Sequence, residues 1–299
     1  MNGENSPRVM GTAPAAPKRG GNKRTGLLAA SLLTACGGGA PLLHPAHTLP
    51  EGEVTFAAGT SGRFALGGLH RAEKDMEEAG ATPSGATTPE QRQAFTNGSL
   101  VRAAIAPGVA PFVAARVGLG QHNEAGLTYT GRSARLDARH AFEWPSLALS
   151  VGGGAIGTFA ESGREAQPPP EGSGAGPRTL SLRSVSGYGL ELPVLFGYRS
   201  DADVVKLWTG LRAGFERYGF NASVIEAPAS PASSTGKATH LWAGGLVGFA
   251  IGLSPVEVRV ELDAAYESAH GHLVTSGGDL TGDAAGWSLT PAMAISAKF

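Results

Sequence analysis

The side chains best suited to binding a metal are two histidines and two carboxylates in the last third of the chain. His270 and His272 stand two residues apart, and Asp279 and Asp283 follow them. Imidazole and carboxylate groups are zinc ligands, but a zinc site needs a complete ligand set, and none is evident here. We therefore expect these residues to be solvated in a loop, and we predict neither a metal nor another cofactor.

A second group of polar residues would suit a hydrolase, because hydrolytic sites combine histidine with serine and carboxylates. The candidates are His122, Glu124, His240 and the 270–283 segment. Nothing in the sequence pairs them with one another. A hydrolase is therefore the least favoured of three functional hypotheses, and we predict that the protein is not an enzyme.

Composition excludes one class of partner. The net charge is −1 and charged residues make up 16% of the chain. Lysines and arginines are scattered, so no basic surface would gather nucleic acid. Residues 152–157 match the G-x-G-x-x-G pattern of nucleotide-binding loops, but no helix follows them, so these glycines are more typical of a crowded strand.

The chain has one cysteine, Cys36, and its surroundings indicate a targeting function. A basic, polar region precedes a short apolar run over 26–35, which is the order of a secretory signal. Leu33-Thr34-Ala35-Cys36 resembles the bacterial lipobox. The resemblance implies cleavage before Cys36 and a lipid on its sulfur, so residues 1–35 would be a lipoprotein signal peptide.

Residues 36–51 are rich in glycine and proline, which is typical of a flexible tether. The remaining residues, 52–299, are expected to form one domain. In its clearest segment, 256–266, apolar residues alternate with charged ones. Alternation with a period of two places these two sets on opposite faces of a strand, and no helix would give one apolar stripe from this order.

The segments of alternation are long for a soluble protein, and their length suits tilted strands that cross a bilayer. Aromatic residues often end the apolar faces, as in the girdles of membrane barrels. Short connections alternate with long ones, and only 121–124 breaks this order. The predicted strands cover about 52–66, 99–106, 109–120, 125–138, 146–159, 185–199, 203–219, 239–252, 256–266 and 287–299.

These features resemble the small bacterial outer-membrane β-barrels of the OmpA-like kind, in a lipid-modified variant. The resemblance covers roughly 99–299 and includes an apolar last strand that ends in Phe299. It implies an all-β, antiparallel, up-and-down barrel, and it gives Phe299 the role of a signal to the barrel assembly machinery. A soluble β-sandwich or lipocalin-like barrel is the alternative, in which the apolar faces would point inward.

The segment 52–98 is less regular than the rest. His70–Glu78 and Pro89–Phe95 have helical patterns, and Thr88 is a suitable N-cap before Pro89. We favour an extracellular helical insertion near 70–96 in a barrel of about ten strands. In the alternative, 52–98 is periplasmic or plugs the lumen, and the barrel has eight strands.

If the apolar faces meet lipid, the charged faces line the lumen. Charges of both signs must pair there, because unpaired buried charge is costly. Arg135 and Asp137 are expected among them. The principal lumen-lining residues are predicted to be Arg102, Arg116, Glu191, Lys206, Arg212, Glu216, Glu257, Arg259, Glu261 and Asp263.

The leading hypothesis is an outer-membrane lipoprotein with extracellular loops, a lumen plugged by ion pairs, and a structural or surface-exposed role such as adhesion. The second is a narrow passive pore for ions or small solutes, and the third is the hydrolase, with its site at the barrel rim. An even number of strands would place Phe299 and Cys36 at the same, periplasmic end, where a lipid of the inner leaflet could hold Cys36.

Overall fold

The computed structural model describes residues 37–81, 88–161, 179–225, 232–275 and 278–299. Its strands form a closed antiparallel barrel in which each pairs with its neighbours in sequence and β1 pairs with β10. This confirms the predicted all-β, up-and-down barrel of ten strands. The strands are β1 (Val54–Ala65), β2 (Gly108–Gly120), β3 (Asn123–Tyr129), β4 (Ser133–Glu143), β5 (Leu147–Glu161), β6 (Thr179–Arg199), β7 (Val205–Ile225), β8 (Ala232–Leu253), β9 (Val256–Thr275) and β10 (Gly278–Lys298).

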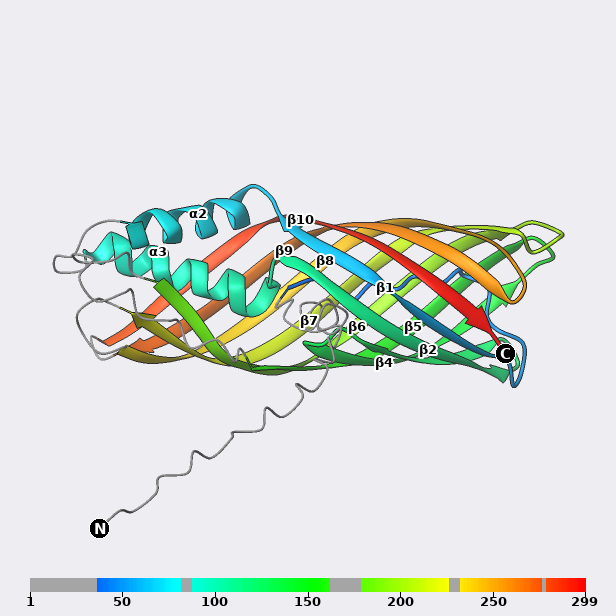
Figure 1. Ribbon diagram of the computed structural model, residues 1–299, viewed down its shortest axis with the longest axis horizontal. Coiled ribbons are helices and arrows are strands. Elements are labelled where there is room, and N and C mark those ends of the chain that lie inside the picture. Colours follow the sequence, from blue (N-terminus) through cyan, green and yellow to red (C-terminus); the bar gives the residue numbers. More distant parts are fainter. Residues whose placement is uncertain (1–36, 82–87, 162–178, 226–231, 276–277) are drawn as a thin grey trace, which may run out of the picture.

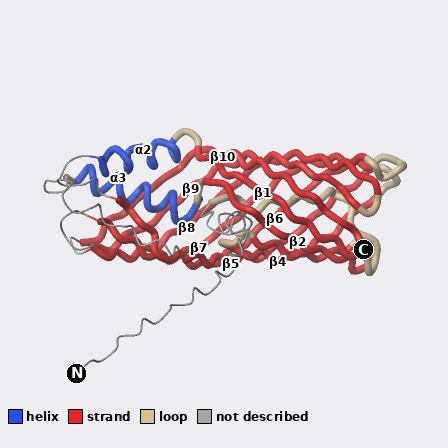
Figure 2. Tube along the Cα trace, viewed as in Figure 1, coloured by secondary structure: helices blue, strands red, loops and turns tan. Residues whose placement is uncertain are grey.

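The two ends of the barrel differ. The short turns after β2, β4, β6 and β8 share one end with the C-terminus, which we call the short-turn end (Figures 1 and 2). There the amide of Val54 donates to the carbonyl of Phe299 at 3.0 Å. The opposite end carries α2 (Gly68–Ala81), α3 (Pro89–Leu100) and a π-helical turn, η2 (Val101–Ile105), and we call it the helical end.

The helical insertion lies between β1 and β2, as predicted for a ten-stranded barrel. Thr88 caps α3, because its hydroxyl accepts from the amide of Gln91 while the Gln91 side chain accepts from the amide of Thr88. The predicted strand 99–106 is wrong, since α3 continues directly into η2. A short apolar run of this kind does not distinguish a strand from a buried helix. No helix among the described residues is both long and apolar enough to cross a bilayer.

One predicted strand is absent and another is in fact two strands, so the predicted number of strands is right although these two assignments are wrong. The predicted strand 125–138 is divided by a turn in which Gly131 has a φ of 76° and the amide of Thr130 donates to Ser133 at 3.0 Å. The connection that broke the predicted order is a tight hairpin, because Gln121 and His122 both have positive φ. That conformation closes a two-residue turn between twisted strands.

The wall of the barrel is uneven in height. Strand β3 has 7 residues, whereas β6 to β10 have 20 to 22 residues each. At the helical end, the helices therefore pack against the inner face of a sheet made of the long strands. Their shared core includes Leu69, Met76, Phe95, Leu100, Ile105, Tyr218, Phe220 and Leu273.

The polarity of the two faces inverts along the long strands. In β9, Val258 and Leu262 point outward while Glu257 and Glu261 are buried inside. From Ser268 to His272 the outward residues are instead polar, and the inward Ala269 and Leu273 are apolar. The inversion marks where the interior changes from a charged lumen to an apolar core beneath the helices. The sequence pattern leaves long connections at 220–238 and 267–286, but the residues of these segments that the structure describes are strand.

The outer surface next to the short-turn end is an apolar belt. Its outward side chains include Leu192, Leu211 and Ile295, which are 66%, 69% and 62% exposed. Along β9 the belt runs from Val256 to Tyr266, which is ~33 Å of strand and about 25 Å of height at a tilt of ~40°. That height matches the apolar band of a membrane barrel. Phe56 and Phe299 mark one edge, and Tyr266 with Trp287 marks the other.

Candidate functional site

The most informative part of the structure is the interior of the barrel, because residues 37–50 run through it. The segment begins at Gly37, packed against Pro107 and Gly108, and ends near Gly118 at the short-turn end. Leu42, Leu43 and Ala46 have exposed fractions of 5%, 4% and 0%. The prediction of a flexible tether is therefore wrong for these residues, which we call the plug (residues 37–50).

Arginines of the wall bind the carbonyl groups of the plug. Arg135 of β4 donates to the carbonyls of Ala40 and Pro41 at 3.0 and 2.9 Å. Arg259 of β9 donates to that of Leu43 at 3.1 Å. A segment with many glycines and prolines forms no secondary structure of its own here, so its carbonyls are free to accept these charge-assisted bonds.

A further arginine binds the plug closer to the short-turn end. Arg139 of β4 donates to the carbonyl of Pro45 and, at 3.0 Å, to that of His47. The same guanidinium donates to Glu124 of β3 at 2.9 Å. Arg139 therefore connects the plug with the ion pairs of the wall.

Carboxylates of the wall bind the amides of the plug. Glu261 of β9 is bidentate, since its two oxygens accept from the amides of Leu42 and Leu43 at 2.9 Å each. Glu143 of β4 accepts from the amide and the hydroxyl of Thr48 at 2.7 and 2.8 Å. The charged wall thus satisfies both donors and acceptors of the extended segment, as a buried backbone requires.

Apolar contacts complete the fit of the plug. Leu42 and Ala46 pack with Leu195 and Trp208, and Trp208 also donates to Glu261 at 3.0 Å. The indole ring lies over Gly248 of the neighbouring strand, where a Cβ atom would come within 2.2 Å of it. Glycine at this position therefore leaves room for the largest aromatic side chain inside the barrel.

Charges of the wall also pair with one another in a layer beside the plug. Arg212 of β7 donates to Glu191 at 2.5 Å and to Asp263 at 2.9 Å, and all three side chains are buried. Arg116 of β2 pairs in the same way with Glu124 and Asp137. The alternation of charge predicts that inward charges of both signs pair, and Glu124, a candidate hydrolase residue in the sequence, is one of the partners.

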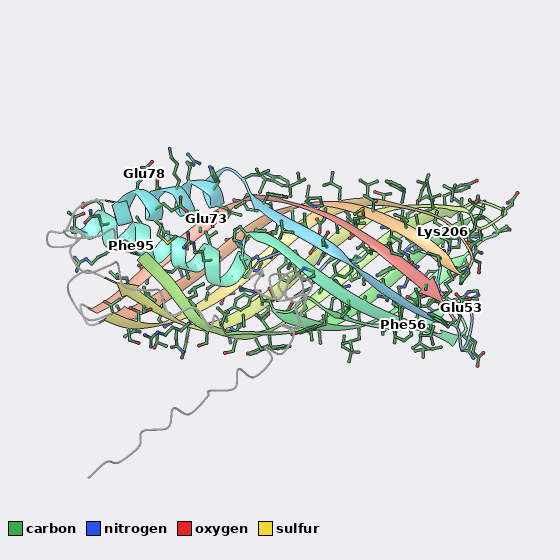
Figure 3. The ribbon with its side chains drawn as sticks, viewed as in Figure 1. Glu53, Phe56, Glu73, Glu78, Phe95 and Lys206 are labelled. Carbon is green, nitrogen blue, oxygen red and sulfur yellow. The ribbon has the colours of Figure 1, made fainter. Side chains whose placement is uncertain are left out.

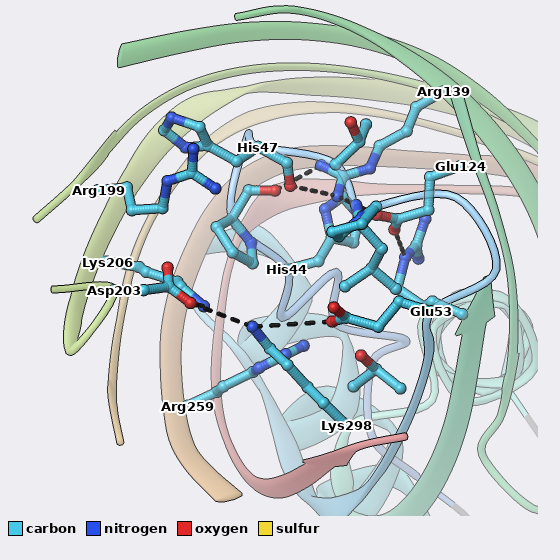
Figure 4. A pocket seen from close by; sticks show the side chains of 16 residues that line it. His44, His47, Glu53, Glu124, Arg139, Arg199, Asp203, Lys206, Arg259 and Lys298 are labelled. Atoms are coloured by element: carbon cyan, nitrogen blue, oxygen red, sulfur yellow. Dashed lines mark hydrogen bonds and ion pairs between the residues drawn. The ribbon is translucent and has the colours of Figure 1, made fainter. Parts of the chain in front are cut away.

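At the short-turn end a cluster of charges surrounds a small cavity of about 110 Å³ (Figure 4). Lys298 lies 3.3 Å from both Asp203 and Glu257, and Glu257 also pairs with Lys206. His44 of the plug lines the cavity, and neither of its ring nitrogens has a hydrogen-bond partner among the described residues. Plug residues between His44 and Pro50 form part of the lining, so the plug occupies this end of the lumen.

The wall holds another polar cluster towards the helical end. His240 of β8 lies between Glu216 and Glu267, at 3.3 and 3.0 Å, and it is completely buried. Arg63 of β1 pairs with Glu267 at 3.1 Å and donates to the carbonyl of Ile105 in η2 at 2.9 Å. This cluster therefore links the wall to the helical insertion.

The predicted lumen residues lie inside the barrel, with one correction. The side chain of Arg102 belongs to η2 rather than to a strand, is 35% exposed and pairs with Glu77 of α2 at 3.2 Å. The others are buried in the interior, although Glu216 belongs to the cluster around His240. Figure 3 places Lys206 and Glu53 at the short-turn end and Glu73 and Glu78 on α2 at the other.

The candidate hydrolase residues do not converge. His122 is exposed in the turn after β2, at the short-turn end, whereas Glu124 and His240 are buried inside the barrel. His270 lies on the outer face of β9 and pairs with Asp283 of β10. Within the described ranges no group of histidine, cysteine, aspartate and glutamate side chains could hold a metal ion.

Sequence reasoning missed three features of this interior. Arg139 shares the alternation of Arg135 and Asp137, so it could have been assigned to the lumen from the sequence. Arg63 lies in a segment of weaker alternation. The plug itself carries no periodic signal, because it is bound mostly through its backbone.

No protein-family model matches the chain. No curated protein matches it either. Among solved structures, it is similar to Neisserial surface protein A at 14% identity and a TM-score of 0.26, over 83% of this chain and 96% of the other.

Two further solved structures are similar at the same low level. A major outer membrane protein from Thermus thermophilus has 10% identity and a TM-score of 0.32, over 82% and 99% of the two chains. The attachment invasion locus protein Ail of Yersinia pestis has 11% identity and a TM-score of 0.24, over 83% and 99%. The chain's own belt and charged interior make it a β-barrel of the outer-membrane type.

Proposed function

We propose that the protein is a non-conducting outer-membrane barrel that acts through the surface beyond the membrane, in a structural or interaction role. The observation that carries this proposal is the plug, which fills the lumen and hydrogen-bonds to its charged wall. The hypothesis of a narrow pore depended on the same inward charges, but most of them are engaged by the plug or by one another.

The proposed orientation puts the short turns in the periplasm and the helical end outside the cell, since membrane barrels have short periplasmic turns and longer extracellular parts. Beyond Tyr266 and Trp287, strands β6 to β10 continue with mostly polar outward side chains and carry the helical insertion on their inner face. We propose that this part of strands β6 to β10, together with the helices, is the surface that makes the interactions. The exposed Phe299, at the end of β10, is the proposed signal to the barrel assembly machinery.

The first test measures conductance. We expect the protein, refolded in detergent and added to a planar lipid bilayer, to give no stable unitary currents, because the plug blocks the lumen. Unboiled samples should migrate differently from boiled ones on a denaturing gel, which shows that the inserted protein is folded. Reproducible current steps from such material would favour the pore, and a change of ion selectivity in Arg212→Ala would then assign the path to this lumen.

The second test concerns the lipid. Cys36 lies outside the described residues, and its lipidation remains a proposal from the sequence. We expect a clickable fatty-acid analogue to label the wild-type protein in cells and not the Cys36→Ala variant, with equal amounts of both in the membrane fraction. Labelling that persists in the variant would mean that the site is elsewhere.

The position of Gly37, the residue after Cys36, indicates at which end of the barrel a lipid on Cys36 would lie. Gly37 lies beside Gly108, at the opposite end of β2 from its short turn. It therefore gives no support to the expectation that Cys36 and Phe299 share one end of the barrel. That expectation assumed a tether that leaves the barrel at the short-turn end, and the plug occupies the lumen instead.

A further inference from the structure

A groove of about 800 Å³ crosses the outer face of the long strands, immediately beyond the apolar belt. It is lined mainly by outward side chains of five neighbouring strands, from β6 to β10, and Tyr218 and Ala238 of the core beneath the helices also border it. None of the outward residues belongs to the lumen or to the interior clusters described above. The outward residues that line it are Ser186, Tyr188, Arg217, Lys237, Thr239, His270, His272 and Thr281.

The strand register places these residues in two adjacent rows. In the first row Tyr188 pairs with Arg217, Arg217 with Thr239, and Thr239 with His270. In the second row Ser186, Gly219, Lys237, His272 and Thr281 follow one another across the same strands.

Gly219 leaves free space in the groove between the two cations Arg217 and Lys237. It lies on the outer face between Arg217 and Asn221 of β7, and it pairs with Lys237 of β8. A Cβ atom at this position would have only the hydroxyl of Ser186 nearby, at 4.0 Å. The space above Gly219 is therefore open, and a ligand that enters it meets Arg217 and Lys237.

Neither cation of the groove has an ion-pair partner in the part of the chain that the structure describes. Arg217 and Lys237 are exposed and form no ion pair with any described residue. The carboxylate next to the groove, Asp283, is engaged by His270. The residues that line the groove therefore include two cations and no carboxylate.

The position of the groove next to the apolar belt indicates which kind of anion it would bind. Arg217 is two residues beyond Phe215, which pairs with Leu241 in the last row of the belt on these strands. Tyr188, which is 64% exposed, belongs to both the belt and the groove. A ligand here touches apolar and cationic surface together, as the headgroup and the upper acyl chains of a membrane lipid would.

We propose that this groove binds the phosphate-bearing headgroup of a lipid in the adjacent leaflet. Arg217 and Lys237 donate to the phosphate oxygens, and Tyr188 packs against the part of the lipid that enters the belt. The inference rests on the proposed placement in the membrane. In the proposed orientation, the lipid belongs to the outer leaflet.

The test titrates the detergent-refolded protein with lipid A, a phosphorylated and acylated glucosamine disaccharide, and counts bound lipid by native mass spectrometry. We expect the dissociation constant to rise roughly twenty-five-fold in Arg217→Gln/Lys237→Gln, about fivefold for each cation. Gly219→Leu should also weaken binding, because its side chain fills the open space without a backbone clash. A dephosphorylated form of the lipid should bind weakly to every variant.

The matched control is Arg71→Gln/Arg92→Gln, which removes two exposed cations from α2 and α3 and should bind like the wild type. Equal binding of lipid A by the groove variant and the wild type would overturn the proposal. Full competition by millimolar inorganic phosphate would also overturn it, in favour of a site for free phosphate. Heat-dependent gel mobility confirms folding of each variant, so a failure here leaves the conductance result of the closed barrel untouched.

Discussion

A chain that begins at Pro50, and so lacks residues 37–49 of the plug, is expected to conduct ions where the chain that begins at Gly37 does not. The wall keeps its own ion pairs without the plug, since Arg212 still has Glu191 and Asp263. The groups that bound the plug, such as Arg135 and Glu261, are then hydrated by water that enters the lumen. Because cations and carboxylates both line the path, the current should be only weakly ion-selective.

Planar-bilayer recordings of the two refolded chains measure this difference directly. A synthetic peptide of residues 37–49, added to the shortened barrel, should reduce the current, whereas a peptide of the same composition in scrambled order should not. A shortened barrel that shows the folded gel mobility and still carries no current would contradict the role of the plug as the block.

Arg212→Met is expected to destabilise the barrel by about 3–5 kcal/mol, the usual cost of removing one partner from a buried ion pair. Without this guanidinium, Asp263 has no cation within ion-pair distance among the described residues, and Glu191 keeps only Arg135 at 3.6 Å. Urea titration of the protein in lipid vesicles, followed by the fraction with folded gel mobility, gives the change in the free energy of unfolding.

The matched control is Arg102→Met, which breaks the partly exposed pair with Glu77. Pairs of this kind contribute about 0–1 kcal/mol, so the control should unfold near the wild-type urea concentration. Removing the stranded carboxylates as well, in Arg212→Met/Glu191→Gln/Asp263→Asn, should recover much of the loss. Equal stability of Arg212→Met and Arg102→Met would mean that water reaches Asp263 and that the layer is not a dry ion-pair network.

The sequence predicts the part of the barrel that faces lipid because there one face of each strand is apolar and the other charged. Residues 256–266 are the clearest example, and the side chains on both faces lie where the alternation puts them. The pattern fails beyond Glu267, because the outward residues become polar while the inward Ala269 and Leu273 are apolar. The outward residues Ser268, His270 and His272 still alternate with inward ones, but the apolar residues now lie on the inward face. A prediction that follows one apolar face along the strand therefore ends the strand too early.

The plug could not be predicted in this way, because its position is set by backbone contacts. Ala40, Pro41 and Leu43 are bound through carbonyl groups that every residue has, so the segment keeps no pattern of side chains. Its glycines and prolines indicate only that it forms no helix or strand. The sequence does show the groups that bind the plug, because the wall has many inward charges of both signs and these charges need partners.

The plug also determines an order of events during folding. It is the first part of the described chain to be synthesised, yet it contacts Glu261 and Arg259 across 219 and 216 residues of sequence. Those partners belong to β9, so the plug cannot reach its final hydrogen bonds until nearly all of the chain is available. The barrel must therefore close with the plug between its strands, and the pairing of β1 with β10 is the step that encloses the plug. The first residues of the described chain are thus among the last to acquire their structure.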